Sequence, residues 1–344
     1  MKHWMIYGAN GYTGELIARE AKVRGLHPII AGRNKASIES LAGELGFVSR
    51  VFNLDNQKDL VKQLVDVDLV LNCAGPFSST AKSMITACIQ SGAHYVDITG
   101  EINVFEYAHS HDAQAAASRI VLCPGVGFDV IPTDCIAAKL KQALPDAIYL
   151  ALGFDSNSSL SAGTAKTAVE GLANGGKVRI NGRIKTVPFA WKTRRIDFGG
   201  GEKLATTFPW GDVSTAYYTT NIPNIEVYVP ASKKRLSMLK KLNYIRWLLG
   251  FGMVQRFLKK KAGEQRGPNA EQLKQLVTYL WGEAKNAKGE SKVMRMIIAN
   301  GYALTVTGSL AVVDYLLQND VNGGYVTPSQ LMGADFINRL PGTR

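Results

Sequence analysis

The stretch that decides the fold is Trp4-Met5-Ile6-Tyr7-Gly8-Ala9-Asn10-Gly11-Tyr12-Thr13-Gly14. An apolar run leads directly into three glycines spaced G-x-x-G-x-x-G, and a helical pattern follows over Gly14–Arg24. In a strand–turn–helix unit, such glycines permit a tight turn, close approach of the backbone to a pyrophosphate, and close helix–strand packing. The helix N-terminus then offers N–H groups and partial positive charge to the phosphates. The motif predicts a dinucleotide site whose turn residues contact the cofactor: Gly8, Asn10, Gly11, Tyr12, Thr13 and Gly14.

Short apolar runs alternate with helical patterns through the first 145 residues. The predicted strands are His3–Tyr7, His27–Ala31, Val48–Asn53, Leu69–Ala74, Tyr95–Ile98 and Ile120–Pro124. Continuously apolar strands such as Leu69–Ala74 are typical of sheets covered on both faces. Alternation of such strands with helices indicates βαβ units and a parallel sheet. We therefore expect an α/β fold, with a doubly wound Rossmann domain over residues 1–145.

The pattern changes after Pro145. Alternating runs rich in β-branched and aromatic residues predict strands at Ala147–Phe154, Lys177–Ile184, Arg195–Phe198 and Ala216–Val229, and a hairpin of Thr278–Ala284 with Val293–Ile298. These features indicate a second, α+β domain over residues 146–301, built on a mostly antiparallel sheet. Helical patterns at Tyr302–Leu317 and from Pro328 to Leu340 follow, and we expect residues 302–344 to pack back on the first domain.

The identity of the cofactor depends on the residues after the second predicted strand. A carboxylate there would bind the ribose 2′-hydroxyl of NAD. The chain instead has Arg33 and Asn34, and a guanidinium can pair with a 2′-phosphate. We therefore expect NADP(H), the alternative being that Arg33 is an ordinary surface arginine.

Two further strand ends are candidates for cofactor contacts. Asp55 follows the third strand, where an adenine contact is usual, although it could equally cap the helix predicted at Gln57–Val65. The backbone of Cys73, Ala74, Gly75 and Pro76 follows the fourth strand, at the edge where dinucleotides bind.

The composition is that of a globular protein, with 344 residues, 46% apolar and 20% charged, which excludes a disordered chain. The four cysteines contain no C-x-x-C pair, so we expect neither a disulfide scaffold nor a metal site. Even with glycines allowed, apolar stretches such as Trp247–Val254 are far short of the ~20 residues that span a bilayer. We expect a cytoplasmic protein without a signal peptide.

The net charge of +12 has a local origin. Residues 233–261 contain ten Lys or Arg and no acid, while the remaining 30 basic and 28 acidic residues nearly balance. A local excess of this kind argues against nucleic acid as a partner. The segment predicts a basic amphipathic helix that contacts a membrane surface or an acyl substrate. The alternative is a stripe packed on the second domain, formed by Leu239, Leu242, Ile245, Leu249 and Phe257.

Several blocks make the chain resemble the saccharopine dehydrogenase-like oxidoreductases, in the branch around the trans-acting enoyl reductases. They are Gly8–Gly14, Ala31–Arg33, Asn72–Phe77, Tyr95–Glu101, Gly127–Asp134, Pro209–Asp212 and Gly323–Pro328. The resemblance implies an NADP-binding Rossmann domain, hydride transfer between NADPH and a C=C or C=N acceptor, and a homodimer. It implies an acyl or lipid-like small molecule as substrate, with an amino-acid-type saccharopine reductase as the alternative.

The sequence offers few groups for proton transfer. None of the tyrosines has Lys four residues later, which excludes the short-chain dehydrogenase pair. Asp129 and Tyr12 are the catalytic candidates, although Asp129 could cap the next helix and Tyr12 could pack against the cofactor. Cys135, near a predicted helix N-terminus, raises the alternative of a semialdehyde dehydrogenase with a cysteine nucleophile. Because no clear acid–base pair is present, an NADP(H)-sensing binding protein without turnover is a further alternative.

Overall fold

The computed structural model describes residues 2–265 and 267–344, and the chain divides into two compact units. The first unit consists of Met1–Phe128 and Tyr302–Pro328, and the second of Asp129–Gly301 and Ser329–Arg344. Each unit has its own sheet.

The first unit is built on a seven-stranded parallel sheet in the order β15-β6-β5-β4-β1-β2-β3. Its strands are β1 (Trp4–Tyr7), β2 (Ile29–Gly32), β3 (Ser49–Val51), β4 (Leu69–Asn72), β5 (His94–Asp97), β6 (Val121–Cys123) and β15 (Gly324–Tyr325). The predicted doubly wound sheet is confirmed, with β15 as a strand that the sequence did not indicate. The strand order reverses between β1 and β4, the switch point beside which ligands of such sheets bind.

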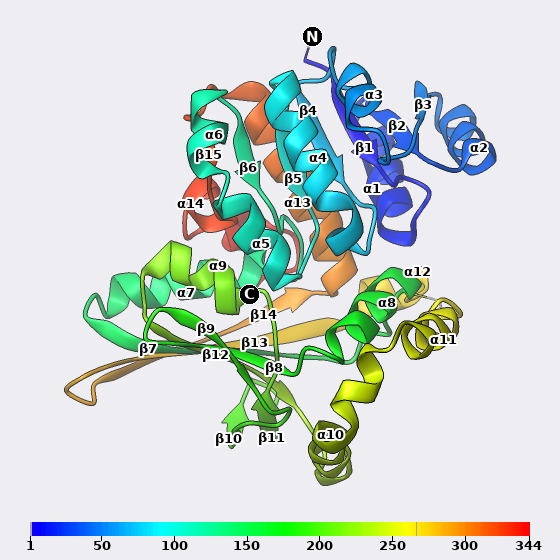
Figure 1. The fold of residues 1–344 in the computed structure, drawn as a ribbon. Coiled ribbons are helices and arrows are strands. Elements are labelled where there is room, and N and C mark those ends of the chain that lie inside the picture. The colour runs from blue at the N-terminus through cyan, green and yellow to red at the C-terminus, as the bar shows by residue number, and fades with distance from the viewer. Residues whose placement is uncertain (1, 266) are drawn as a thin grey trace. The chain divides into compact units, whose positions relative to one another are not determined.

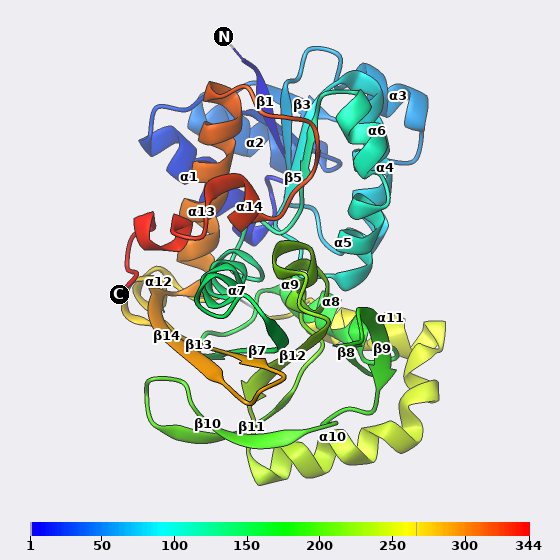
Figure 2. The same ribbon diagram turned by 90° about the vertical axis from the view of Figure 1, so that its left-hand side faces the viewer.

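Helices cover both faces of this sheet. They are α1 (Tyr12–Val23), α2 (Lys35–Leu45), α3 (Gln57–Lys62), α4 (Phe77–Ser91), α5 (Ile102–His109), α6 (Asp112–Ala117) and α13 (Gly301–Gln318). Figure 1 shows α4 and α5 in front of the strands, and Figure 2 shows α1 and α13 on the opposite side of the sheet from α3–α6. The chain between β5 and β6 forms two helices, α5 and α6, and at the break the Ser110 hydroxyl donates to the carbonyl of Tyr107 at 2.7 Å.

The second unit is built on an eight-stranded sheet. Its strands are β7 (Ala147–Ser156), β8 (Gly176–Ile180), β9 (Arg183–Val187), β10 (Thr193–Asp197), β11 (Glu202–Thr207), β12 (Asn224–Pro230), β13 (Val277–Asn286) and β14 (Ser291–Ala299). The main path runs β10-β11-β12-β7-β13-β14, with β8 on β12 and β9 on β8. Apart from the parallel pair β7–β12, the neighbouring strands of this sheet are antiparallel, which confirms the predicted second sheet.

The helices of the second unit include α7 (Ile131–Ala143), α8 (Ala162–Gly171), α9 (Asp212–Thr220), α10 (Lys233–Ile245), α11 (Gly252–Ala262), α12 (Ala270–Gln275) and α14 (Pro328–Met332). Two strand predictions were wrong here. Ala216–Val229 is not one strand, because α9 runs to Thr220 and Asn221, at φ +57°, turns the chain into β12. Lys177–Ile184 is likewise a hairpin, since Asn181 and Gly182 both have positive φ between β8 and β9.

Helix α7 groups with the second unit, so the division falls after Phe128 and not at residue 145. A Cβ atom at Gly282 of β13 would lie 2.5 Å from Cγ2 of Ile136 and 2.8 Å from Cδ1 of Leu140. This glycine lets α7 pack directly on β13. The C-terminal residues from Ser329 onward also group with this unit, where the Ser329 N–H donates to Asp134 at 2.8 Å. Residues 302–328 therefore return to the first unit, but residues 329–344 do not.

The basic segment forms α10, a short 3-10 helix at Arg246–Gly250, and α11, and is thus not one continuous helix. The glycines at 250 and 252 flank the junction between the last two elements. No helix among the described residues is both long and apolar enough to cross a bilayer.

Candidate cofactor site

The glycine turn between β1 and α1 is packed too closely for larger residues. Gly8 has φ +80°, and a Cβ atom there would lie 2.7 Å from both the backbone nitrogen and Cβ of Ala74. A Cβ atom at Gly14 would lie 2.5 Å from the carbonyl oxygen of Gly8. The turn thus lies directly beside the end of β4, at the switch point of the sheet. This is the backbone cradle that a dinucleotide pyrophosphate requires.

Helix α1 begins without a side-chain cap. Its N-cap is Gly11, which has no side chain to accept the first N–H groups, and the N–H of Glu15 is the one that bonds back to Gly11. The N–H groups of the first turn of a helix have no intrahelical partner, so those of Thr13 and Gly14 suit an anion. The turn residues therefore fit a phosphate-bearing cofactor.

Arg33 lies just beyond the end of β2, and its side chain is exposed. No ion pair or hydrogen bond of its guanidinium occurs within the described part of the chain. Its positive charge acts on Tyr7 of β1, as does the negative charge of Asp55. Burial is the larger influence and raises the pKa of Tyr7 to about 12. The ends of β1, β2 and β3 thus bring Tyr7, Arg33 and Asp55 near one another.

Asparagine side chains cap the two helices that follow β2 and β3. The side chain of Asn34 caps α2 by accepting from the N–H of Ser37 at 3.1 Å. The residue that caps α3 is Asn56, which accepts from Lys58 and Asp59. The alternative interpretation, in which Asp55 caps α3, was therefore wrong. The carboxylate of Asp55 is exposed and does not cap this helix.

The loop after β4 is held by a buried asparagine. Oδ1 of Asn72 accepts from the N–H of Ala74 at 3.0 Å, and its Nδ2 donates to the hydroxyls of Tyr95 and Thr80 at 3.3 Å each. Thr80 donates in turn to the carbonyl of Ala74 at 2.7 Å. The chain at Cys73–Pro76 is thus fixed against the glycine turn. Burial raises the pKa of the Cys73 thiol, so this residue is a neutral thiol at the site.

Asp97, at the end of β5, connects three strand ends. It is fully buried and accepts from the Tyr95 hydroxyl at 2.7 Å, the Thr99 N–H at 3.0 Å and the Gly125 N–H at 2.9 Å. Since Tyr95 also contacts Asn72, one polar network joins the loops after β4, β5 and β6. Burial raises the pKa of Asp97 to about 6, although its three donors favour the charged form. None of these three bonds is to a cation, so Asp97 is held by neutral donors.

The catalytic candidates belong to different units, and each is described within its own. Tyr12 is the first residue of α1, and its ring lies edge-to-face against Tyr302 of α13, with centroids 5.1 Å apart. Burial, and then Tyr302, raise the pKa of Tyr12 to about 12. Asp129 is half-buried, and it is not the N-cap of α7, which is Val130.

Cys135 is unsuited to the role of nucleophile. Its side chain is fully buried in α7, and burial, followed by the nearby charge of Asp134, raises its pKa to about 12. A nucleophilic cysteine needs an accessible thiolate, so the semialdehyde dehydrogenase alternative was wrong. No cluster of three or more potential metal-binding side chains occurs among the residues that the structure describes.

Some residues of the site had no signal in the local sequence. The N–H of Phe128 donates to Oγ1 of Thr305 at 3.0 Å, and a Cβ atom at Gly127 would lie 3.0 Å from Cγ2 of the same threonine. Thr305 and Tyr302 come from α13, about 175 residues further along the chain. Periodicity identifies such a helix but not its partners.

The sheet order, the glycine cradle and the uncapped helix together define a dinucleotide-binding Rossmann domain. Residues 4–122 match the family model described as the saccharopine dehydrogenase NADP binding domain. This part of the chain is thus similar to that domain, in agreement with the resemblance that its motifs indicated.

Three curated proteins are similar to parts of this chain. A human saccharopine dehydrogenase-like oxidoreductase is 25% identical over 54% of this chain and 50% of its own length. A lipid droplet localized protein of Caenorhabditis elegans is 24% identical over 70% of this chain and 63% of its own length. A trans-acting enoyl reductase of Mycobacterium ulcerans is 26% identical over 38% of this chain and 33% of its own length. The chain spans about half the length of the first of these relatives.

A solved structure supports the fold over nearly the whole chain. Apo saccharopine dehydrogenase (L-Glu forming) from Saccharomyces cerevisiae superimposes with a TM-score of 0.65, covering 98% of this chain and 96% of its own. At 12% identity, the similarity concerns the fold.

Proposed function

We propose that this protein is an NADPH-dependent oxidoreductase that transfers hydride to a C=C or C=N bond of an acyl or lipid-like substrate. The observation that carries the proposal is the packing of Gly8 against Ala74 at the switch point of the sheet, with Arg33 at the neighbouring strand end. The names of the human and mycobacterial relatives support oxidoreductase chemistry, and the latter supports a C=C acceptor.

The preference for NADPH over NADH rests on Arg33. The guanidinium is exposed and positively charged, and it lies at the strand end where NAD-specific domains carry a carboxylate. A bidentate, charge-assisted contact with a 2′-phosphate is the interaction for which arginine is best suited. The carboxylate of Asp55 would repel a phosphate, so in this proposal Asp55 contacts the adenosine.

In this proposal the protein contributes binding, orientation and one proton. Bound NADPH supplies the hydride, and the second hydrogen reaches the acceptor as a proton. The turn residues and Thr13 hold the pyrophosphate, while the network of Asn72 and Asp97 holds the loops at the nicotinamide end. With its pKa raised to about 12, the Tyr12 hydroxyl keeps its proton at neutral pH and acts as a hydrogen-bond donor. Asp129 is the second candidate for proton transfer, and a homodimer is part of the proposal.

The first experiment is thermal unfolding of the purified protein with NADPH, with NADH, and without cofactor. A ligand at 100 times its dissociation constant stabilises the folded state by ~2.7 kcal/mol, which moves the midpoint by several degrees. We expect a shift with NADPH and a much smaller one with NADH. No shift with either cofactor would overturn the proposal.

Turnover is tested by oxidation of NADPH in the presence of unsaturated acyl compounds and imines. Consumption of NADPH with a C=C acceptor supports the enoyl reductase chemistry. Tight NADPH binding without turnover of any acceptor would favour the alternative, a protein that senses the NADP(H) pool.

A further inference from the structure

The segment Lys233–Ala262 of the second unit has an unusual concentration of exposed apolar side chains. Seventeen large apolar residues are exposed among those described, and eight of them fall between residues 238 and 257. They are Met238 (52%), Tyr244 (83%), Ile245 (46%), Trp247 (68%), Leu248 (37%), Phe251 (53%), Met253 (76%) and Phe257 (68%). Scattered apolar residues on a surface need no explanation, whereas a contiguous set marks a site of interaction.

These side chains are not the ones that attach the segment to its own unit. The half-buried apolar residues of the segment are a separate set: Leu236, Leu239, Leu242, Leu249, Val254 and Leu258. Polar contacts reinforce the attachment. Asn243 bonds to the N–H and the carbonyl of Phe189 at 2.8 and 3.1 Å, and Lys259 pairs with Glu170. The predicted stripe was therefore only partly right, since Ile245 and Phe257 face solvent.

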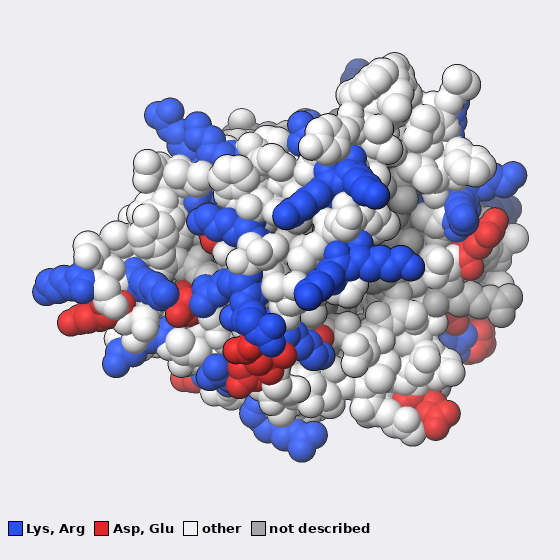
Figure 3. All heavy atoms as spheres, turned by 90° about the horizontal axis from the view of Figure 1, so that it is seen from below, with Lys and Arg blue, Asp and Glu red and all other residues white. Residues whose placement is uncertain are grey.

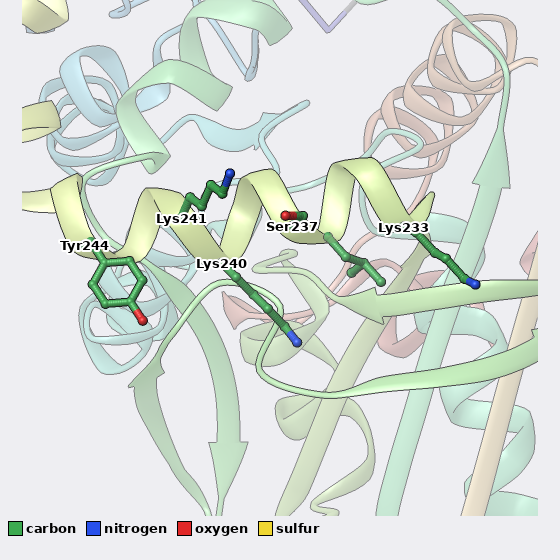
Figure 4. A pocket seen from close by; sticks show the side chains of 6 residues that line it. Lys233, Ser237, Lys240, Lys241 and Tyr244 are labelled. Carbon is green, nitrogen blue, oxygen red and sulfur yellow. The ribbon is translucent and has the colours of Figure 1, made fainter.

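The same segment is strongly cationic. It contains ten Lys or Arg and no acid between residues 233 and 261, and among the described residues Lys259 is the one cation of the ten with an ion pair. A shallow hollow of about 380 Å³ on α10 is lined by Lys233, Leu236, Ser237, Lys240, Lys241 and Tyr244. Figure 4 shows that these side chains all come from the one helix, so the hollow is an open groove.

We propose that Lys233–Ala262 docks this protein on the surface of an anionic phospholipid membrane. Exposed Trp247, Phe251 and Phe257 would enter the headgroup–acyl boundary, and the lysines of α10 would meet the lipid phosphates. Aromatic and aliphatic side chains interspersed with Lys and Arg are what an interfacial helix needs, because burial of apolar area and attraction to anionic lipids add together. The proposal does not depend on the proposed function.

Charge favours a membrane over the other occupants of such a surface. A second copy of the chain would place ten cations against ten cations, which is unfavourable without intervening acids. Nucleic acid would satisfy the lysines but would leave most of the exposed apolar side chains in water. Figure 3 shows a face on which Lys and Arg side chains outnumber Asp and Glu, with uncharged surface between them. An anionic bilayer complements the ten cations of Lys233–Ala262, a segment that contains no acid.

The test measures binding of the full chain to vesicles by co-sedimentation. One set of vesicles is phosphatidylcholine, and in the other about a third of the lipid is phosphatidylserine. We expect at least about tenfold stronger binding to the anionic vesicles, weakened by high salt. Equal binding to both, or binding to neither, would overturn the proposal.

Two sets of variants separate the apolar and cationic contributions. The triple change Trp247→Ser, Phe251→Ser, Phe257→Ser and the triple change Lys233→Gln, Lys240→Gln, Lys241→Gln should each reduce binding about tenfold or more. Matched controls are Val23→Ser with Val65→Ser, which are exposed apolar residues of the first unit, and Lys185→Gln, Lys288→Gln, Lys292→Gln, exposed lysines of the second. Both controls should bind like the unchanged protein, and an equal loss in the controls would contradict a specific docking segment.

Two further outcomes would assign the surface to another partner. If the apolar triple variant converts a dimer to a monomer in light scattering while the unchanged protein ignores vesicles, the surface is a subunit interface. If the protein binds a DNA duplex and does not bind vesicles, the lysines form a nucleic-acid-binding surface and the membrane proposal is overturned. The midpoint of thermal unfolding of each variant shows that it is folded.

Discussion

The carboxylate of Glu101 caps a helix that begins 24 residues earlier: Oε1 accepts from the N–H of Phe77 and Oε2 from the N–H of Ser78, both at 2.8 Å. Glu101 follows β5, and Phe77 is the first residue of α4. A carboxylate at a helix N-terminus satisfies unpaired donors and interacts favourably with the helix dipole. The contact ties the loop after β5 to the helix that follows Pro76.

Replacing this carboxylate should destabilise the first unit. Glu101→Gln retains one acceptor but loses the charge and one bond, so we expect a loss of about 1–2 kcal/mol in the free energy of unfolding. Thermal and urea unfolding measure it. Glu39→Gln is the control, because Glu39 is exposed and its ion-pair distance to Lys35 is 4.0 Å. If both variants unfold alike, the cap does not contribute.

Arg33→Ala should separate the two nicotinamide cofactors. Loss of a charge-assisted bond to the 2′-phosphate costs about 1.5–3 kcal/mol, or roughly 10- to 150-fold in the dissociation constant for NADPH. The affinity for NADH should stay nearly the same, as measured by titration calorimetry. Arg183→Ala, an exposed arginine of the second unit, should alter neither affinity. An equal loss for both cofactors would contradict the assignment of Arg33.

Gly8→Ala tests the cradle against a matched glycine. At Gly8 the added Cβ meets Ala74 at 2.7 Å and φ is +80°, so the cost combines a clash with backbone strain, roughly 2–5 kcal/mol. At Gly25, φ is +69° but nothing lies within 4 Å, so Gly25→Ala should cost about 1–2 kcal/mol. Cofactor binding should be lost in the first variant and kept in the second. Intact NADPH binding by Gly8→Ala would show that the turn is not the phosphate site.

Asp97 should give the protein a pH-dependent stability. Its pKa is raised from 3.8 to about 6, so the folded state binds this proton more tightly than the unfolded state. The stabilisation is therefore complete below pH 3.8 and is lost as the pH rises through about 6, a change of roughly 3 kcal/mol.

Other carboxyl groups affect the pH dependence of stability in the opposite direction, because arginine lowers the pKa values of Glu44 and Asp66. Their contribution to stability is lost as the pH falls. The measurement is thus the difference between the unchanged protein and Asp97→Asn. The stability of Asp97→Asn relative to the unchanged protein should rise between pH 4 and pH 6, and parallel curves would contradict burial of an ionisable Asp97.

Cys135 should be inert in the folded protein. Its thiol is buried and its pKa is about 12, so alkylation by iodoacetamide should require unfolding. Mass spectrometry of the native protein should find Cys135 unmodified, and Cys135→Ala should retain any NADPH-dependent activity. Rapid labelling at this position would reopen the nucleophile hypothesis.

The cofactor turn could be predicted because its requirements are local. The G-x-x-G-x-x-G spacing and the apolar run before it lie together in Trp4–Gly14, whereas the close approach of Gly8 to Ala74 required the fold. The sheet followed from the same kind of evidence, because a strand covered on both faces is apolar throughout. The strand β15 has two residues, too few to show an apolar pattern in the sequence. It pairs with β6 only because residues 302–328 return to the first unit.

The polar network and the division into units depended on contacts between distant residues. Asn72 and Asp97 each look like the polar end of a strand, and only the register of β4 against β5 shows that they and Tyr95 meet. Residues 216–229 alternate as a strand would, but Asp212 to Thr220 gain more from packing as a helix beside α7. In the basic segment, composition identified the cations, whereas the exposure of Ile245 and Phe257 required the fold.

The first unit is assembled from two separate pieces of chain, residues up to Phe128 and residues 302–328. Ribosomal synthesis therefore completes the whole of the Asp129–Gly301 stretch before the last helix and strand of the cofactor domain exist. Until then β6 has an unpaired edge, and the N–H of Phe128 lacks Thr305. A gene truncated after residue 128 should yield an aggregation-prone fragment. Co-expression with a peptide covering 302–328 should supply the missing helix and strand and yield the folded first unit.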